Sequence, residues 1–481
     1  AIDLGASTVS GTYTVTAGGA VTDSGTQEIT GVTTISASGQ DVTLNTATNN
    51  FAAAVGITGA NVAVVDAGAI DLGASTVSGT YAVTATASGD ITNSGVLAIT
   101  GGATFKVDDG RSITLNQSNT FSSTVTFTPL SGTIAAVTIK DSNTLDLKAL
   151  TLTGDLNVTA GGAVTNSGTL VIPGTATISA SSQAVTLNES SNDFGTAAIT
   201  GANVAITDTN AIILGASTVT GTYTVTAGGA ITESGDLAIT GVTTLVAGSH
   251  AITLDRTGNN FQAAVIVTSG GNVQLVDTNA IILGASTVTG TYAVTATSGN
   301  ITADSGALII TGASTFKTVA NGSDIELDYA THAFSNSVTL KAGSGGGGTF
   351  GDITFVDSEG AVDLDSSASA NGDLYIDAST DGAVGGTLSI KALNGVITQN
   401  VDLAVTDATT LEAGSNAITL NRSGNDFQDA VIVTSGGDVA LRDTNAIVLG
   451  ASTVTGTYSV QAAGAITESG DLAITGVTTL V

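Results

Sequence analysis

AIDLGASTVSGTYTVTAGG, at residues 1–19, decides the fold, because the rest of the chain repeats it. It returns almost unchanged near residues 69, 211, 280 and 446, and in altered form near residues 144 and 361. The units group into two triplets at residues 1–210 and 211–445. Their period of roughly 67 to 85 residues predicts a repeat architecture in which each unit packs against its neighbours.

Short bursts of alternation within each unit, such as VTLN, AVGIT and TYTVTA, place apolar and hydroxyl residues at period two. That period is typical of half-buried strands, and the 3.6-residue period of a helix is missing. The first unit divides into three parts of about 23 residues, which suits one turn of a parallel β-helix with three short strands. We therefore predict one continuous all-β parallel β-helix (β-solenoid) over residues 1–481, with about three coils per repeat.

The alternation also predicts the core. In the first unit the inward positions are expected to be Ile2, Leu4, Val9, Tyr13 and Val15. The tyrosine returns in most units, and Leu156 replaces it in the unit near residue 144; its copies are Tyr13, Tyr81, Tyr223, Tyr292 and Tyr458. A phenylalanine follows a turn residue once per unit, as Phe51, Phe121, Phe194, Phe261, Phe334 and Phe427. We interpret both sets as core fillers in preference to an exposed aromatic binding stripe.

Composition excludes several classes of partner. The net charge of −30, from 40 acidic and 10 basic residues, makes nucleic acid and anionic membrane surfaces unfavourable partners. Apolar runs are all too short for a transmembrane helix. Cysteine is absent, so disulfides and thiolate metal sites are excluded. The chain lacks methionine and a signal peptide and stops within a repeat, so we expect it to be an internal segment of a longer polypeptide.

Acidic residues recur at two corners of each unit. The first corner holds Asp66, Asp141, Asp208, Asp277, Asp357 and Asp443; the second holds Asp23, Asn93, Asn166, Glu233, Asp304 and Glu468. Calcium requires six to eight oxygen ligands in one place, and Asp208, Asp277 and Asp443 are the candidates for weak calcium binding. The nonapeptide of calcium-binding β-rolls is absent, and the exchange of Asp, Glu and Asn favours turn residues. We expect no cofactor beyond weakly bound calcium.

The sequence evidence for an enzymatic, histidine-based metal or ice-binding site is weaker than that for calcium. Asp363, Asp365 and Asp373 crowd one stretch near Tyr375, as the clustered carboxylates of pectate-lyase-like β-helix enzymes would, but a solvated acidic insertion over residues 363–381 is favoured. Neither His250 nor His332 has a second histidine or a cysteine nearby in sequence. Threonine pairs are not repeated in every turn, which disfavours an ice-binding face. We predict no catalytic residue and no enzymatic activity.

Three motifs carry a resemblance to a known family: AITESGDLAITGVTTL at residues 230–245 and 465–480, AITLNRSGNDF at residues 417–427, and the DTNAI-LGAS junctions. With these motifs the chain resembles the repetitive segments of filamentous-haemagglutinin-like exoproteins and giant bacterial surface adhesins. The resemblance implies a right-handed parallel β-helix rod, an extracellular or cell-surface location and no catalytic residue.

Two structural functions remain open at this point. The first is the rigid shaft of a bacterial surface adhesin, whose contacts with a host or neighbouring cell or with polysaccharide would come from regions outside this segment. The second is a subunit of an extracellular filament or sheath that associates end to end or laterally, because uncapped strand stacks expose unpaired backbone groups. A polysaccharide-active β-helix enzyme is a weaker third alternative.

Overall fold

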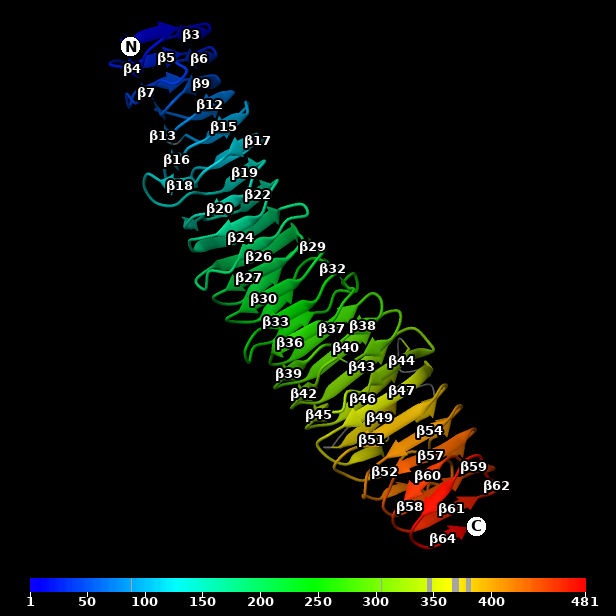
Figure 1. The fold of residues 1–481 in the computed structure, drawn as a ribbon. Coiled ribbons are helices and arrows are strands. Elements are labelled where there is room, and N and C mark those ends of the chain that lie inside the picture. Colours follow the sequence, from blue (N-terminus) through cyan, green and yellow to red (C-terminus); the bar gives the residue numbers. More distant parts are fainter. Residues whose placement is uncertain (88, 304, 344–347, 366–371, 378–381) are drawn as a thin grey trace. The chain divides into compact units, whose positions relative to one another are not determined.

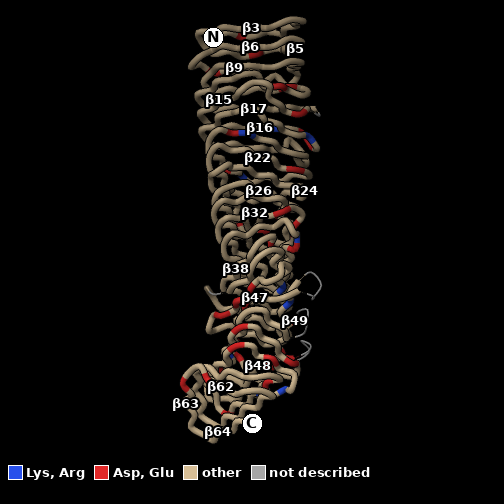
Figure 2. Tube along the Cα trace, turned by 90° about the vertical axis from the view of Figure 1, so that its right-hand side faces the viewer, with Lys and Arg blue, Asp and Glu red and all other residues tan. Residues whose placement is uncertain are grey.

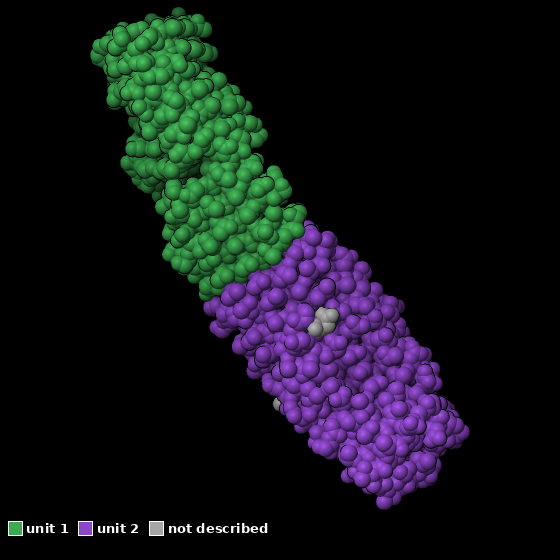
Figure 3. Space-filling model, viewed as in Figure 1, with its two compact units in different colours: residues 1–228 green, residues 229–481 purple. Residues whose placement is uncertain are grey.

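The fold is a parallel β-solenoid. The computed structural model describes residues 1–481 except 88, 304, 344–347, 366–371 and 378–381. In the described residues there are 64 strands and no helix, and the parallel strands stack in about 22 turns (Figure 1). The chain divides into two compact units, Ala1–Gly228 and Gly229–Val481 (Figure 3). The predicted all-β parallel β-solenoid is confirmed.

Three short strands make one turn. The strands of the first repeat are β1 (Ile2–Leu4), β2 (Ser7–Val9), β3 (Tyr13–Thr16), β4 (Val21–Asp23), β5 (Gln27–Ile29), β6 (Thr33–Ser36), β7 (Val42–Leu44), β8 (Asn50–Phe51), β9 (Val55–Gly59) and β10 (Val62–Asp66). They are short because Gly, Asn, Asp and Ser interrupt every apolar burst and turn the chain at the corners. Strands of the same face pair in parallel with the next turn, so each turn is hydrogen-bonded to its neighbours.

The strand register in the first repeat shows that each turn is shorter than the roughly 23 residues obtained by dividing the unit evenly by three. Ile2 pairs with Val21, Val21 with Val42, and Val42 with Val62, so each turn advances the chain by about 20 residues. Three turns are therefore complete at Val62, whereas the next unit begins its first strand, β11 (Ile70–Leu72), eight residues later. A repeat is thus three turns plus one additional strand.

The same step of eight or nine residues occurs at every junction between repeats. It separates Val62 from Ile70, Val137 from Leu145, Val204 from Ile212, Val273 from Ile281, Ile353 from Val362, and Val439 from Ile447. Repeats therefore differ in length because their three turns differ in length. The three turns run from Ile2 to Val62 in the first repeat and over a longer stretch, from Val362 to Val439, in the sixth.

This additional strand shifts each repeat onto a neighbouring ladder. The ladder that begins at Ile2 continues from Val62 to Tyr81 in β13 (Tyr81–Ala85), not to Ile70. Instead, β11 and β12 (Ser75–Val77) both stack on β9. Equivalent residues of adjacent repeats therefore do not lie directly above one another, and a threonine or aromatic stripe with the period of the repeat cannot form.

Every second residue of a strand points into the core. The phenylalanines of the six repeats are all buried, as are Tyr81, Tyr223, Tyr292 and Tyr458. The first turn differs, because it has a neighbouring turn on one side only: Leu4 and Val15 are buried, Tyr13 and Val9 are half-buried, and Ile2 is 36% exposed. The expectation of burial for Ile2 is thus wrong in this turn, while its counterpart Ile70 is fully enclosed.

A buried serine accompanies the core tyrosine. At the start of the fifth repeat, the Ser286 hydroxyl donates to the Gly284 carbonyl (2.9 Å) and accepts the Val267 amide of the previous turn (3.1 Å). The Tyr292 hydroxyl lies close to Ser286 but outside hydrogen-bonding geometry, and burial raises the pKa of Tyr292 above its ordinary value. The repeat near residue 144 replaces both partners together, with Leu150 for the serine and Leu156 for the tyrosine.

We expect Tyr292→Phe to increase the free energy of unfolding by up to about 1 kcal/mol, because it removes a buried hydroxyl without a partner. Tyr292→Ala should lower it by about 3–5 kcal/mol by leaving a cavity. Denaturant unfolding followed by circular dichroism measures both effects, with Tyr13→Phe in the half-buried first turn as a neutral control. A loss of stability in Tyr292→Phe would show that the hydroxyl is bonded.

Candidate functional site

The acidic residues of the first corner lie at the junctions between repeats; we call them the junction acids. Asp277 ends β37 (Val273–Asp277), after which the chain turns toward the next repeat. One of its carboxylate oxygens accepts the amide of Phe261 in the previous turn (2.7 Å), and the other accepts the amide of Asn279 two residues ahead (2.7 Å). The side chain is fully buried. A single carboxylate thus joins two turns and closes the corner.

All six junction acids accept the corresponding two amides. Four of them use both carboxylate oxygens (Asp66, Asp208, Asp277 and Asp443), whereas Asp141 and Asp357 accept both amides on one oxygen. The phenylalanine amides of the previous turn are bound at 2.7 to 3.3 Å, in the pairs Asp66–Phe51, Asp141–Phe121, Asp208–Phe194, Asp277–Phe261, Asp357–Phe334 and Asp443–Phe427. The amide two residues after each acid is bound at 2.6 to 3.1 Å. No strand pairing among the described residues joins these phenylalanines to the following turn, so the carboxylate supplies the acceptor for the phenylalanine amide.

Burial raises the pKa of every junction acid, although the accepted amides act in the opposite direction. For the calcium candidates Asp208, Asp277 and Asp443 the consequence is direct. Both oxygens of each carboxylate already accept backbone amides, and each side chain is almost completely enclosed. We therefore interpret these three residues as structural caps and not as calcium ligands.

A second buried polar ladder lies two residues before each core phenylalanine. Asn259 is fully buried; its Oδ1 accepts the Leu237 amide (2.9 Å) and its Nδ2 donates to Glu233 (3.0 Å). Asparagine has the same role at four further positions, where the amides of Gln27, Leu97, Leu170 and Leu403 are accepted by Asn49, Asn119, Asn192 and Asn425. Sequence reasoning did not assign this ladder, although the asparagine before the phenylalanine was visible.

The remaining member of the ladder is His332. Its Nδ1 accepts the Leu308 amide (3.0 Å), so the ring is neutral with its proton on Nε2, which donates to the Ala303 carbonyl (2.9 Å). Ala303 stands at the corner where Glu233 binds Asn259 in the preceding repeat. The imidazole thus donates to a backbone carbonyl at this corner, and burial lowers the pKa of His332.

The second corner therefore serves the ladder. Asp23 and Glu233 accept the amide groups of Asn49 and Asn259, and burial raises the pKa of Glu233. Asn93 and Asn166 donate to the ladder asparagines instead, which explains why Asp, Glu and Asn exchange here. Glu468 is exposed in the last turn, and Asp304 lies outside the described residues.

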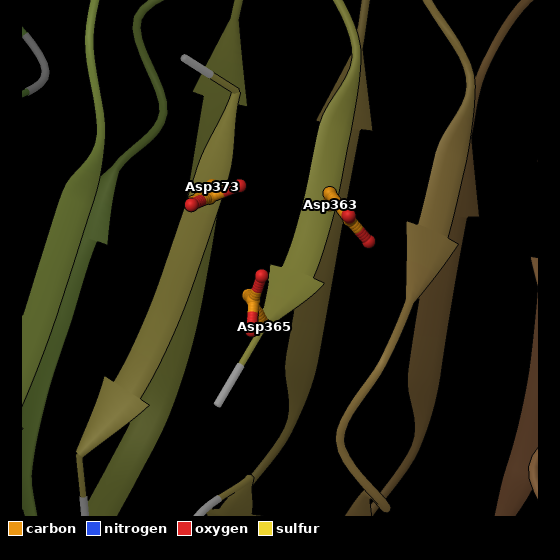
Figure 4. A group of neighbouring side chains, drawn as sticks. All are labelled: Asp363, Asp365 and Asp373. Carbon is orange, nitrogen blue, oxygen red and sulfur yellow. The ribbon is translucent and has the colours of Figure 1, made fainter. Parts of the chain in front are cut away.

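The acidic insertion brings three carboxylates together. Asp363 and Asp365 lie on β48 (Val362–Asp365), and Asp373 begins β49 (Asp373–Asp377), where it pairs in register with Asp363 (Figure 4). One carboxylate oxygen from each lies within 4.8 Å of the others, and Asp363 also accepts the Thr398 hydroxyl (2.8 Å). Residues 366–371 and 378–381 of the insertion lie outside the described residues. Acidic groups often converge without an ion, so the cluster alone assigns no metal.

Strand β49 is an inserted strand, placed between β48 and β46 (Val338–Ala342). Lys341 on β46 forms an ion pair with Asp377 (3.5 Å), which partly balances the acidic face. Figure 2 shows that Asp and Glu recur along each unit whereas Lys and Arg are few. His250 is exposed in a turn, apart from the ladder. The described part of the chain has no candidate transmembrane helix.

The fold and these internal caps define a parallel β-solenoid repeat protein. The chain belongs to the family of repeats of unknown function DUF5649, whose model matches residues 1–58, 59–128, 134–200, 201–268, 270–341, 351–434 and 436–481. Each match after the first begins ten residues before the corresponding repeat start near residues 69, 144, 211, 280, 361 and 446. No curated protein and no solved structure matches the chain.

His332 makes a pH dependence testable. An unfolded histidine takes up a proton near its ordinary pKa of about 6.5, whereas the buried ring takes it up only at lower pH. The folded state therefore loses stability as pH falls below about 6.5, with Asp328 partly opposing the effect. We expect the stability of His332→Asn relative to wild type to increase between pH 7.5 and pH 5, by less than about 1.4 kcal/mol per pH unit.

Thermal unfolding at each pH measures this difference, and the comparison between variants cancels the contribution of the carboxylates. His250→Asn, in the exposed turn, should follow the wild-type profile. Parallel profiles for His332→Asn and wild type would contradict the assignment of a neutral, bonded imidazole.

Proposed function

We propose that this chain is a structural segment of an extracellular bacterial protein, the rigid shaft of a surface adhesin. The observation that carries the proposal is the use of the recurring polar residues. The junction acids and the ladder asparagines form hydrogen bonds that join one turn to the next. Without these bonds they would be the first candidates for a catalytic or metal-binding role. We therefore assign the repeated polar residues a structural role, which is to hold successive turns together.

Stiffness follows from the same contacts. Within each compact unit, a bend would separate neighbouring turns and break parallel backbone hydrogen bonds together with the carboxylate caps. The phenylalanine and tyrosine side chains fill the interior, so the unit cannot flatten without opening cavities. A shaft needs this resistance, and its stability is close to a sum over neighbouring turns.

Charge favours the shaft over a laterally packed filament or sheath. With a net charge of −30, copies of the chain repel one another at low ionic strength. The absence of cysteine suits a long chain exported unfolded, and the resemblance to filamentous-haemagglutinin-like exoproteins supports the bacterial surface.

Immunogold electron microscopy with an antibody against residues 1–481 tests the proposal on cells that make the full protein. We expect label outside the cell envelope, on thin projecting fibres. Label confined to the cell interior would overturn the extracellular assignment. Label on ordered lateral lattices would overturn the shaft and support the filament or sheath.

A further inference from the structure

One seam between successive turns of the first compact unit is built differently from the others; we call it the open seam. It lies between residues 121–133 and residues 143–151. At the equivalent place one repeat earlier, the Ser75 hydroxyl accepts the Ile57 amide (3.0 Å) and donates to the Gly73 carbonyl (3.0 Å). The same serine bridge closes the junctions at Ser217, Ser286 and Ser452.

The open seam lacks this bridge. The sequence LGAS, which carries the serine, reads LKAL at residues 147–150, so Leu150 offers no acceptor to the turn above. Strand β18 (Val125–Pro129) pairs with β20 (Leu145–Leu147) through Val125 and Leu147, as β9 pairs with β11 through one residue pair. Strand β9 also pairs with β12, whereas the described residues give β18 no such pairing with β21 (Leu150–Thr151). Pro129 has no amide hydrogen to donate to a ladder. After this pair the two turns are next joined by the isolated bridge between Ile134 and Leu152.

Two cavities follow the open seam. The first, of about 570 Å³, is lined by Ser122, Ser123, Thr124, Asn143 and Asp146 among others. The second, of about 530 Å³, is lined by a set that includes Thr126, Thr128, Pro129, Leu150, Thr151 and Thr169. Both are clefts open to solvent, since Ser122, Ser123 and Thr124 in the first are exposed.

Hydroxyl groups are more numerous at this place than at the equivalent place in the first repeat. Ser122, Ser123 and Thr124 follow the core phenylalanine, where the first repeat has alanine at residues 52–54. Charge in the cavity is balanced, because Asp146 forms an ion pair with Lys148 (2.6 Å) and also accepts the Ser167 hydroxyl (2.8 Å). Against the effect of burial, Lys148, Ser167 and the Thr165 hydroxyl, which donates to the other carboxylate oxygen, hold the pKa of Asp146 below its ordinary value.

Apolar surface lies beside these polar groups. Pro129, which is half-buried, and Ala149, which is exposed, line the second cavity. Hydroxyls, an amide and a charge-balanced carboxylate on one side, with small apolar surfaces on the other, match a ligand that has hydroxyl edges and C–H faces. The acidic chain as a whole disfavours an anionic polymer.

We propose that the open seam binds a neutral oligosaccharide of a few sugar units, with the serine and threonine hydroxyls, Asn143 and Asp146 bonding the sugar hydroxyls. The inference is independent of the shaft proposal, since it concerns one seam and not the repeats. An extended peptide is the competing occupant, because β18 has so little pairing with the following turn.

Isothermal titration calorimetry on the whole chain tests this with cellohexaose, xylohexaose, maltohexaose and mannohexaose, and with hexagalacturonate as the anionic comparison. We expect at least one neutral hexasaccharide to bind. Ser123→Trp, which fills the first cavity from an exposed position, should weaken that binding by at least about tenfold. Ala53→Trp, at the equivalent position of the first repeat, should leave it unchanged.

A second variant closes the seam instead of obstructing it. Lys148→Gly with Leu150→Ser and Leu156→Tyr restores the serine bridge and the core tyrosine of the other repeats, and should abolish sugar binding while circular dichroism and the melting temperature show an intact fold. The proposal is overturned if no neutral hexasaccharide binds, if hexagalacturonate binds as tightly, if Ser123→Trp has no effect, or if an array of twelve-residue peptides binds in place of the sugars.

Discussion

The structure depends on one hydrogen bond, from the phenylalanine amide of one turn to the buried junction acid of the next. Each repeat is three turns plus one strand, so the chain must step to a neighbouring ladder once per repeat. At that step no strand pairing among the described residues joins a two-residue strand such as Asn260–Phe261 to the following turn, and its amide would be buried without a partner. The carboxylate of Asp277 supplies the acceptor, and its second oxygen closes the corner.

This step also determines what the surface can display. Since equivalent residues of adjacent repeats occupy different ladders, repetition in sequence does not become a repeated stripe on one face. Function then has to come either from the mechanical properties of the stacked turns or from places where the sequence of one repeat differs from the others. Two departures stand out: the open seam, where Leu150 replaces the bridging serine, and the acidic insertion, where Asp363, Asp365 and Asp373 converge.

Much of this was predictable from the sequence and some was not. Period-two alternation identified the strands, and the exchange of Tyr for Leu156 indicated an interior position. The additional strand was missed because the unit was divided evenly by three, although the step from Val62 to Ile70 recurs almost without change. The carboxylates of Asp208, Asp277 and Asp443 suggested calcium because sequence alone cannot show that backbone amides occupy them. The open seam was not predicted, because the sequence alone does not show that the serine replaced by Leu150 bridges two turns.

The central claim is that the junction acid holds the phenylalanine strand to the following turn. Amide hydrogen–deuterium exchange at Phe261, resolved by mass spectrometry with electron-transfer fragmentation, tests it in Asp277→Ala, with Asp255→Asn at an exposed position as the control. Loss of a hydrogen bond to a charged group, worth about 1.5–3 kcal/mol, should accelerate exchange at Phe261 by about tenfold to a hundredfold, with little change in distant turns. Unchanged exchange at Phe261 in a folded Asp277→Ala variant would contradict the account.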